Sequence, residues 1–364
     1  MTSMSSGLVA LSLLGGLAVL IAGAEGLVRG ASRLALLAGI SPLVVGLTVV
    51  AMGTSAPELV VCVKAGLTGN PDLAVGNVVG SNIFNVLFIL GAAALITPLV
   101  VARQIVRLEV PIMIGASLLM WALALDRRVS AAEGAALTAL MIGYTGWTIR
   151  RSRREVAAKR EEAGPVEPPT ARAVLGGVAL VAGGLVLLVL GARWFVDGSV
   201  SLARALGVSD LVIGLTIVAA GTSMPEVATS VVAALRGERD IAIGNVVGSS
   251  IFNVLGILGI SALVTPGGLG VASAVVDFDL PVMVAVAIAC LPIFMTGYSI
   301  GRLEALVFLG YYAAYVAYLV LAAQEHDALP AYSRVVMEFA VPLTALGLAV
   351  TFWRTRKRGG LAPY

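Results

Sequence analysis

The sequence predicts an all-α polytopic membrane protein, built from two inverted five-helix repeats plus one extra C-terminal transmembrane helix. Three observations lead to this prediction: few charges, many long apolar segments and an internal duplication. Of the 364 residues, 59% are hydrophobic and only 12% are charged, whereas soluble domains carry about 25% charged residues. So few charges cannot cover a water-exposed surface. The composition therefore excludes a cytosolic enzyme, a nucleic-acid-binding protein and a disulfide-stabilised scaffold.

Hydropathy divides the chain into eleven apolar segments, most of them close to the roughly 20 residues needed to cross a bilayer. Five spans are expected in the first half, near residues 8–26, 42–67, 73–95, 105–125 and 132–150. Five more are expected in the second half, near residues 173–196, 211–235, 241–263, 273–295 and 303–323. The eleventh, 335–353, has no counterpart in the first half. Because residues 1–7 lack the basic region of a cleaved signal peptide, the first span is expected to be retained.

The two halves of the chain are duplicates of each other. A shift of 168 positions places residues 46–91 on residues 214–259 without a gap, and most of the aligned residues are identical. Glycine, proline, glutamate and asparagine all stay in register, which chance similarity between apolar helices does not produce. Because each repeat has an odd number of spans, we expect the two copies to cross the membrane in opposite directions.

The basic residues predict the orientation and the domain limits. The densest basic run, 150–154, follows the fifth span and is expected in the cytoplasm, where Lys and Arg collect beside membrane spans. Counting spans from it places the N-terminus outside and the C-terminal tail inside, and we expect the plasma membrane as the location. The predicted domains are a first five-helix repeat (1–152), a charged, proline-containing cytoplasmic linker (153–172), a second, inverted repeat (173–323), and a loop, extra helix and basic tail (324–364).

Two polar motifs interrupt the apolar spans of each repeat. The first reads Gly-Thr-Ser-x-Pro-Glu at 53–58 and again at 221–226. The second reads Gly-Asn-Val-Val-Gly-Ser-x-Ile-Phe-Asn at 76–85 and 244–253. Proline lacks an N–H and crowds the carbonyl four residues earlier, so Pro57 and Pro225 predict broken helices with freed carbonyls nearby. Irregular backbone at membrane depth survives where it lines a cavity, and paired broken helices in inverted repeats point to a transport site near the middle of the membrane.

The motifs supply oxygen ligands for a hard cation. Glu58 and Glu226 lie well inside their spans, where an uncompensated charge costs roughly 3 kcal/mol or more. Hydroxyl and amide side chains recur four residues apart on the same helical faces, namely Thr54 with Glu58, Thr222 with Glu226, Ser81 with Asn85, and Ser249 with Asn253. Ca²⁺ takes six to eight oxygen ligands and would offset both glutamates. Two monovalent ions could do the same, and competition for shared ligands is a basis for exchange.

Other interpretations of these residues stay open at this point. Gly76, Gly80, Gly244 and Gly248 can serve as close-packing positions between helices rather than as part of a site. Asn77 and Asn245 can be hydrogen-bonding links between helices. The glutamates can carry protons instead of metal ions.

At these two motifs the sequence resembles the sodium/calcium exchangers of the cation/calcium exchanger superfamily, of the bacterial or archaeal type. The resemblance covers about residues 8–323 and implies ten helices in two inverted halves, with ions held between the second, third, seventh and eighth. It implies Glu58 and Glu226 as central ligands of transported Ca²⁺ and Na⁺. The further ligands it implies are the hydroxyls of Thr54, Ser55, Thr222, Ser223, Ser81 and Ser249, the amide of Asn85, and the carbonyls of Ala51 and Ala219. Asn253 stands where many relatives carry Asp, which puts the ion stoichiometry and any potassium dependence in question.

The expected function is therefore secondary antiport of Ca²⁺ against Na⁺ by alternating access, with no enzymatic activity and no cofactor. The expected partners are the two ions and the lipid bilayer, with no nucleic acid, and the sequence identifies no protein partner. Calcium or cation/proton exchange and potassium-dependent exchange are alternatives on the same scaffold, and a passive channel is a third. An intramembrane enzyme is disfavoured because the single histidine, His326, lies in a predicted loop and no HExxH or GxSxG motif occurs.

Overall fold

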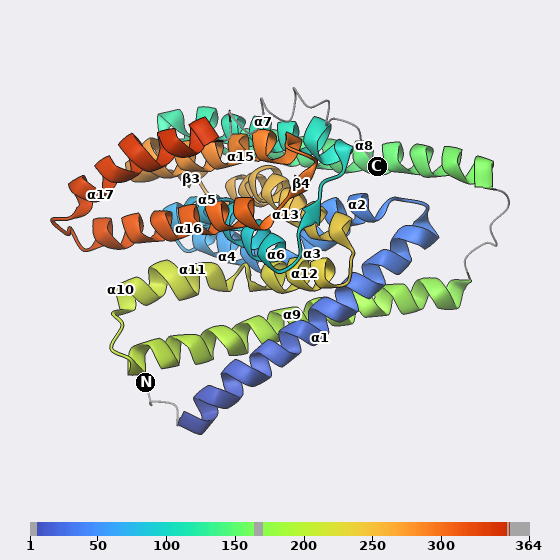
Figure 1. The fold of residues 1–364 in the computed structure, drawn as a ribbon, viewed down its shortest axis with the longest axis horizontal. Coiled ribbons are helices and arrows are strands. Elements are labelled where there is room, and N and C mark those ends of the chain that lie inside the picture. The colour runs from blue at the N-terminus through green and yellow to red at the C-terminus, as the bar shows by residue number, and fades with distance from the viewer. Residues whose placement is uncertain (1–5, 164–169, 348, 350–364) are drawn as a thin grey trace.

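The protein is described by a computed structural model that covers residues 6–163, 170–347 and 349. The chain is predominantly helical, with long helices stacked in layers around a central group of shorter ones (Figure 1). The first half comprises α1 (Ser6–Ala38), α2 (Pro42–Val45), η1 (Gly46–Val50), α3 (Ala51–Thr54), α4 (Ala56–Leu67), α5 (Pro71–Phe84), η2 (Asn85–Leu90), α6 (Gly91–Ile96), β1 (Leu99–Val100), η3 (Ile105–Glu109), α7 (Val110–Leu123), η4 (Ala124–Asp126), β2 (Arg128–Val129) and α8 (Ala131–Ala163).

The second half repeats this order of elements, except for the turn η4, and adds a further helical segment. It comprises α9 (Ala171–Ala205), α10 (Asp210–Ile213), η5 (Gly214–Val218), α11 (Ala219–Gly221), α12 (Met224–Leu235), α13 (Arg239–Phe252), η6 (Asn253–Leu258), α14 (Gly259–Val264), β3 (Leu269–Gly270), η7 (Val275–Asp279), α15 (Leu280–Met295), β4 (Ser299–Ile300), α16 (Arg302–Ala323), α17 (Leu329–Val335) and η8 (Val336–Ala340). The η segments are π-helical, except the 3₁₀ turn η4.

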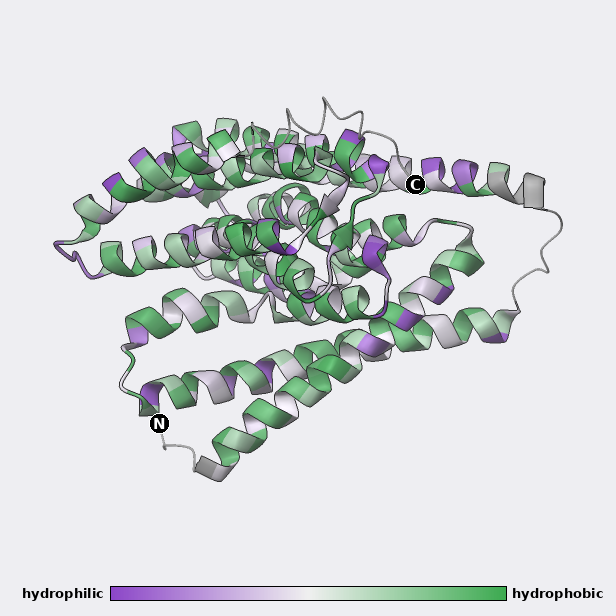
Figure 2. Cartoon of the chain, in the orientation of Figure 1, coloured by the Kyte–Doolittle hydropathy of each residue, from purple (hydrophilic) through white to green (hydrophobic). Residues whose placement is uncertain are grey.

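Seven helices of the described chain are long and apolar enough to cross a membrane, and nine spans result when each of two bent pairs counts as one. Figure 2 shows apolar residues along these helices and hydrophilic ones toward the C-terminal end of α8. The predicted fifth span lies inside α8, which is not among these seven helices. Of the predicted eleventh span, the part up to residue 347 is largely helical, and residues 348 and 350–353 lie outside the described chain.

Two predicted span ends were wrong. The first span was expected to end at residue 26, but α1 continues to Ala38, and the sixth was expected to end at residue 196, but α9 continues to Ala205. The first residues of the predicted linker, 153–172, belong to α8, which remains helical to Ala163. In all three cases charged residues follow the apolar stretch, and such residues favour helix as readily as leucine does. The prolines of the predicted linker lie outside the described chain.

Helices α1 and α9 are equivalent in the two repeats and pack against each other in opposite directions. Gly16 contacts the turn at Gly191, and Gly23 contacts the turn at Gly184. A methyl group added to Gly23 would lie 2.9 Å from the Gly184 carbonyl, so only glycine allows the backbones to approach this closely. The pair lies on one side of the molecule, apart from the central helices α5 and α13 (Figure 1).

Two short antiparallel ladders join the loops of the two halves. Strand β1 pairs with β4, with Leu99 opposite Ile300, and β2 pairs with β3, with Val129 opposite Leu269. The residue directly before α2 also makes a contact across the molecule, because the Ser41 N–H donates to the Ser152 hydroxyl of α8 at 2.8 Å. Each of these contacts joins loops that the sequence analysis places on the same side of the membrane.

Candidate cation site

The predicted helix breaks are confirmed. The helical segments Pro42–Thr54 and Ala56–Leu67 meet at an angle of 46°, and the equivalent segments Asp210–Gly221 and Met224–Leu235 meet at 52°. Each proline lies in the first turn after the break, a position where its missing N–H has no helical partner to lose. The glutamate that follows each proline therefore lies in the first turn of a new helix.

The two glutamates are held by serines of the opposite repeat. The Ser55 hydroxyl donates to Oε1 of Glu226 at 2.8 Å, and the Ser223 hydroxyl donates to Oε1 of Glu58 at 2.9 Å. Glu58 and Glu226 are each only 1% exposed. Their two carboxylates, when ionised, repel each other. The crossed hydrogen bonds thus bring the acids of both repeats into one buried site.

Several oxygens around this site have no partner within the described chain. Five of them belong to residues that the sequence analysis selected, namely Oε2 of Glu58, Oε2 of Glu226, Oδ1 of Asn85, Oδ1 of Asn253 and Oγ1 of Thr222. Buried polar atoms are normally hydrogen-bonded, and an uncompensated buried carboxylate is costly. A group of unpaired carboxylate, amide and hydroxyl oxygens fits a hard cation, which accepts oxygen ligands only.

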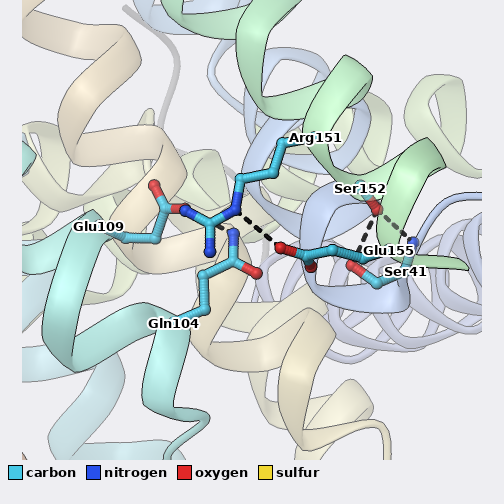
Figure 3. A network of polar contacts seen from close by, with 6 residues as sticks. All are labelled: Ser41, Gln104, Glu109, Arg151, Ser152 and Glu155. Atoms are coloured by element: carbon cyan, nitrogen blue, oxygen red, sulfur yellow. Dashed lines mark hydrogen bonds and ion pairs between the residues drawn. The ribbon is translucent and has the colours of Figure 1, made fainter. Parts of the chain in front are cut away.

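In a third buried carboxylate, that of Glu109, both oxygens accept hydrogen bonds from side chains. Glu109 of η3 is also inaccessible to solvent, but the Tyr144 hydroxyl donates to its Oε2 at 2.6 Å and Gln104 Nε2 donates to its Oε1 at 2.7 Å. Figure 3 shows Gln104 and Glu109 beside the polar residues of α8. Because both of its oxygens are satisfied by side chains, Glu109 needs no ion. Glu58 and Glu226 differ from it in keeping one oxygen free.

The remaining predicted ligands make different contacts in the two repeats. The hydroxyl oxygens of Ser81 and Ser223 lie 3.3 Å apart, within hydrogen-bond distance, and Ser249 donates to the Ala51 carbonyl at 3.5 Å. The Ala51 carbonyl also accepts the Ser55 N–H at 3.0 Å, so it is hydrogen-bonded within the broken helix. Ala219, the equivalent of Ala51, is exposed to solvent where Ala51 is fully buried.

Two equivalent helix contacts, η1 with α13 and η5 with α5, also differ between the repeats. The segment η1 packs tightly on α13, since a methyl group added to Gly46 would meet the Ile241 carbonyl at 3.0 Å, and Gly244 and Gly248 are similarly enclosed. The segment η5 leaves α5 uncovered, because methyl groups on Gly214, Gly76 and Gly80 would have nothing within 4 Å. The close-packing interpretation therefore holds for the glycines of α13 and fails for those of α5.

The hydrogen bonds follow the same division. The Thr54 hydroxyl donates to Oδ1 of Asn245 at 3.1 Å, and Nδ2 of Asn245 donates to the Ser230 hydroxyl at 3.0 Å. The equivalent asparagine, Asn77, donates instead to the thiol of Cys62 at 3.3 Å, and the hydroxyl of Thr222 is unpaired. Asn245 thus forms the hydrogen-bonding link between helices that the sequence analysis left open. Asn77, its equivalent, does not form the corresponding bond to Thr222.

Sequence reasoning missed Asn82. Its Oδ1 accepts a hydrogen bond from Nδ2 of Asn253 at 3.0 Å, and its own Nδ2 donates to the Ser250 carbonyl at 3.1 Å. A signal was available, because residue 82 and its equivalent, Ser250, form the single mismatch between the blocks 76–85 and 244–253. At this mismatch the two blocks contact each other, through the Asn82 side chain.

No group of three or more His, Cys, Asp or Glu side chains in the described chain could hold a metal ion. The site has two carboxylates, and its other oxygens come from hydroxyl, amide and carbonyl groups. This donor set is hard and carries at most two negative charges, so it matches one divalent ion or two monovalent ions better than it matches a transition metal.

Comparisons with known proteins agree with this geometry. The chain matches the family described as sodium/calcium exchanger protein over residues 8–150 and 176–321. It is 34% identical over 343 residues to sodium/calcium exchanger MaX1 of Methanosarcina acetivorans, covering 85% of this chain and 97% of that protein. It is 37% identical over 282 residues to the putative antiporter CaxA of Alkalimonas amylolytica, covering 76% of this chain and 86% of that protein.

A solved structure has the same fold. The sodium-calcium exchanger NCX_Mj, soaked with zero Na⁺ and Ca²⁺, superposes with a TM-score of 0.73 at 30% sequence identity, covering 86% of this chain and all of that one. The fold class expected from the sequence, an all-helical membrane exchanger, is thereby confirmed. With two halves that match the family and a buried site of crossed glutamates between them, this chain belongs to the sodium/calcium exchanger family.

Proposed function

We propose that this protein is a secondary antiporter that exchanges Ca²⁺ for Na⁺ by alternating access, with both ions bound between the two helix breaks. The observation that carries the proposal is the pair of buried glutamates, each held by a serine of the other repeat and each keeping one oxygen unpaired. Membership in the exchanger family supports antiport of a cation against Ca²⁺. The geometry of the site supports Glu58 and Glu226 as the ligands of both ions.

The shared ligands make the two ions compete. One Ca²⁺ between Glu58 and Glu226 neutralises both carboxylates and can recruit the amide oxygens of Asn85 and Asn253 to complete a shell of six to eight oxygens. Sodium ions neutralise the same carboxylates one charge at a time. Because neither glutamate can serve both ions fully at once, binding of one kind displaces the other, and movement of the loaded site across the membrane becomes an exchange.

The unequal helix contacts support alternating access. The contact between η1 and α13 is closed, and the equivalent contact between η5 and α5 is open. Since the two contacts have nearly the same sequence, closing the open one while opening the closed one costs little net free energy. A two-state transporter needs two conformations of nearly equal free energy. Helices α1 and α9, which meet along a glycine-lined contact, can slide against the central helices as the two contacts exchange.

We infer the orientation from the loops and the basic residues together. The ladders β1–β4 and β2–β3 join loops that the arginine distribution assigns to the cytoplasmic and the outer side, respectively. Antiparallel packing of the equivalent helices α1 and α9 is what inverted repeats produce. In this orientation the open contact of η5 with α5 faces the outside of the plasma membrane, and the end of α8 lies in the cytoplasm.

A flux assay tests the exchange. Purified protein in liposomes loaded with Na⁺ is diluted into Na⁺-free buffer that contains radioactive Ca²⁺, and uptake is compared with that of liposomes loaded with K⁺ or choline at the same pH. We expect rapid uptake only from the Na⁺-loaded liposomes. Equal uptake in all three, or uptake that follows an imposed pH gradient at constant Na⁺, contradicts sodium coupling and favours a channel or a proton exchanger.

A further inference from the structure

An open apolar groove runs between α7 and α8, on the outer surface of the helix bundle. Its volume is about 930 Å³, and its lining includes Gly115 and Leu119 from α7 and Ala136, Gly143 and Trp147 from α8, with Leu255 of η6 as the floor. The small residues leave the space free, since methyl groups on Gly115 or Gly143 would have nothing within 4 Å. The ion site does not use this groove, although Leu255 follows Asn253 by two residues.

The equivalent surface of the second repeat is covered by a helix. Tyr144 and Tyr315 are equivalent, so residues 140 and 143 of the groove correspond to Tyr311 and Ala314 of α16. The Tyr311 hydroxyl donates to the Ala340 carbonyl at 2.9 Å, and the Tyr332 hydroxyl donates to the Ala314 carbonyl at 2.8 Å. The extra segment α17–η8, which has no counterpart in the first repeat, thus packs against α16 on the face that corresponds to the first groove. The first groove lacks such a cover within the described chain.

A row of arginines continues the groove along α8. Arg150, Arg151 and Arg154 follow Trp147 by three, four and seven residues, so they lie on the same helical face as the lining side chains. The Arg151 guanidinium lies 5.7 Å from the centre of the Trp147 ring and pairs with Glu155 at 2.8 Å (Figure 3). Arg150 and Arg154 are exposed and take part in no ion pair of the described chain.

We propose that this groove binds one anionic phospholipid of the cytoplasmic leaflet, with an acyl chain between α7 and α8 and the headgroup phosphate at Arg150 and Arg154. From Ala136 to Trp147 the groove is about 16 Å long, at about 1.5 Å of helix rise per residue. This is close to half of the roughly 30 Å hydrocarbon core, which is one leaflet. Trp147, which is 46% exposed, lies where the apolar chain gives way to the headgroup, a common place for tryptophan.

Charge decides between a lipid and a protein helix as the occupant. At the covered groove, the positions equivalent to Arg150, Arg151 and Arg154 are Leu321, Ala322 and Glu325, none of them basic. The open groove alone ends in a cluster of positive charge, which matches an anionic headgroup, and basic pockets between helices on the cytoplasmic side are suited to such headgroups. The proposal rests on the orientation inferred above, and its test requires no transport.

Native mass spectrometry of the full-length protein in detergent provides the measurement. The protein is titrated with dioleoyl-phosphatidylglycerol and, separately, with dioleoyl-phosphatidylcholine. We expect one phosphatidylglycerol to bind at least tenfold more tightly than phosphatidylcholine. The double variant Arg150→Gln/Arg154→Gln should weaken phosphatidylglycerol binding by roughly thirtyfold, since each basic residue near an anionic surface contributes about 1 kcal/mol, and should leave phosphatidylcholine binding unchanged.

Matched variants separate the groove from the surrounding surface. Gly143→Leu fills the groove and should lower the binding of both lipids, whereas Gly146→Leu, where an added methyl group also meets nothing within 4 Å, should bind as wild type does. Arg153→Gln removes a charge from another face of α8 and should have little effect. If Gly143→Leu does not fold, the arginine variants on the surface still decide the question.

Three outcomes overturn the proposal. Equal affinity for the two lipids removes the role of the headgroup. Unchanged phosphatidylglycerol binding in both Gly143→Leu and Arg150→Gln/Arg154→Gln places the lipid elsewhere. A dimer that forms without lipid and is lost in Gly143→Leu shows that a second copy of the chain occupies the groove. None of these results depends on whether the protein exchanges Na⁺ for Ca²⁺, so the proposed function stands or falls separately.

Discussion

The Thr54 hydroxyl donates a hydrogen bond to Oδ1 of Asn245 at 3.1 Å, whereas the equivalent hydroxyl, that of Thr222, has no partner in the described chain. The two threonines stand in identical motifs, so the difference arises from packing and not from composition. On the side of Thr54, α13 is closed against the first helix break. On the side of Thr222, α5 is not closed against the second break, since methyl groups on Gly76 and Gly80 would have nothing within 4 Å.

Cysteine labelling should report this asymmetry. Val50 and Val218 are equivalent positions on η1 and η5, and they are 0% and 49% exposed, respectively. In ion-free buffer we expect Val218→Cys to react with a membrane-impermeant maleimide added from outside, and Val50→Cys to be unreactive from either side. Adding Thr54→Val to Val50→Cys should increase its labelling from the cytoplasmic side, because the closing hydrogen bond is lost. The native thiols of Cys62 and Cys290 are buried, so the unsubstituted protein is the background control.

Removing either carboxylate charge should abolish exchange. In Glu58→Gln or Glu226→Gln the serine of the opposite repeat can still bond to the side chain, but Ca²⁺ loses half of the charge that offsets its own. We expect Na⁺-driven Ca²⁺ uptake to fall at least a hundredfold, with the thermal stability of the purified protein preserved or increased, since a buried charge is removed. Uptake in liposomes and Tm in detergent check both parts.

A matched pair of acids outside the site serves as the control. Glu133 and Glu304 are equivalent in the two repeats and accept hydrogen bonds from the backbone at the starts of α8 and α16. Glu133→Gln and Glu304→Gln should retain exchange within about twofold of wild type and lower stability by up to about 1 kcal/mol, the usual value of a helix cap. Exchange that survives Glu226→Gln as well as Glu304→Gln does would remove Glu226 from the mechanism.

Asn253→Asp should make exchange depend on pH in a new way. Nδ2 of Asn253 donates to Oδ1 of Asn82 at 3.0 Å, and an aspartate can replace this bond only while it is protonated. As the pH rises and the carboxyl group ionises, its oxygen repels that of Asn82, and the site gains a third negative charge. We expect the ratio of variant to wild-type flux to change with pH, and the number of Na⁺ per Ca²⁺ to differ at high pH. A constant flux ratio together with an unchanged stoichiometry contradicts this prediction.

The contact of α1 with α9 predicts a difference between two glycines of one helix. A methyl group on Gly23 would lie 2.7 Å from the Leu188 backbone nitrogen, whereas one on Gly15 would have nothing within 4 Å. Overpacking costs about 1–3 kcal/mol, so Gly23→Ala should lower Tm by several degrees and slow exchange. Gly15→Ala should leave both unchanged or raise Tm slightly, because alanine favours helix. Equal Tm values for the two variants would show that the helices do not pack as described.

Much of the site could be predicted from sequence because its key residues recur. A polar motif repeated in two apolar segments cannot be explained by hydropathy, so Glu58, Glu226 and their neighbouring serines stood out. Asn82 did not, because its role depends on a contact with Asn253 of the other repeat, and a hydrogen bond between residues so far apart leaves no periodic pattern. The length of α1 was missed for another reason, since a helix that leaves the apolar region continues on propensity and on packing against α9.

The sequence by itself determined the membrane class, the duplication, the helix breaks and the two acids, because each follows from local chemistry: apolar length, register, a missing proline N–H and a charge in an apolar span. Only the tertiary structure decided that serines and glutamates pair across the repeats, which oxygens are left unpaired, and which of two equivalent contacts is closed. Nearly identical sequences favour both contacts about equally. The choice between them is made by packing of the whole molecule, which a repeat in the sequence cannot reveal.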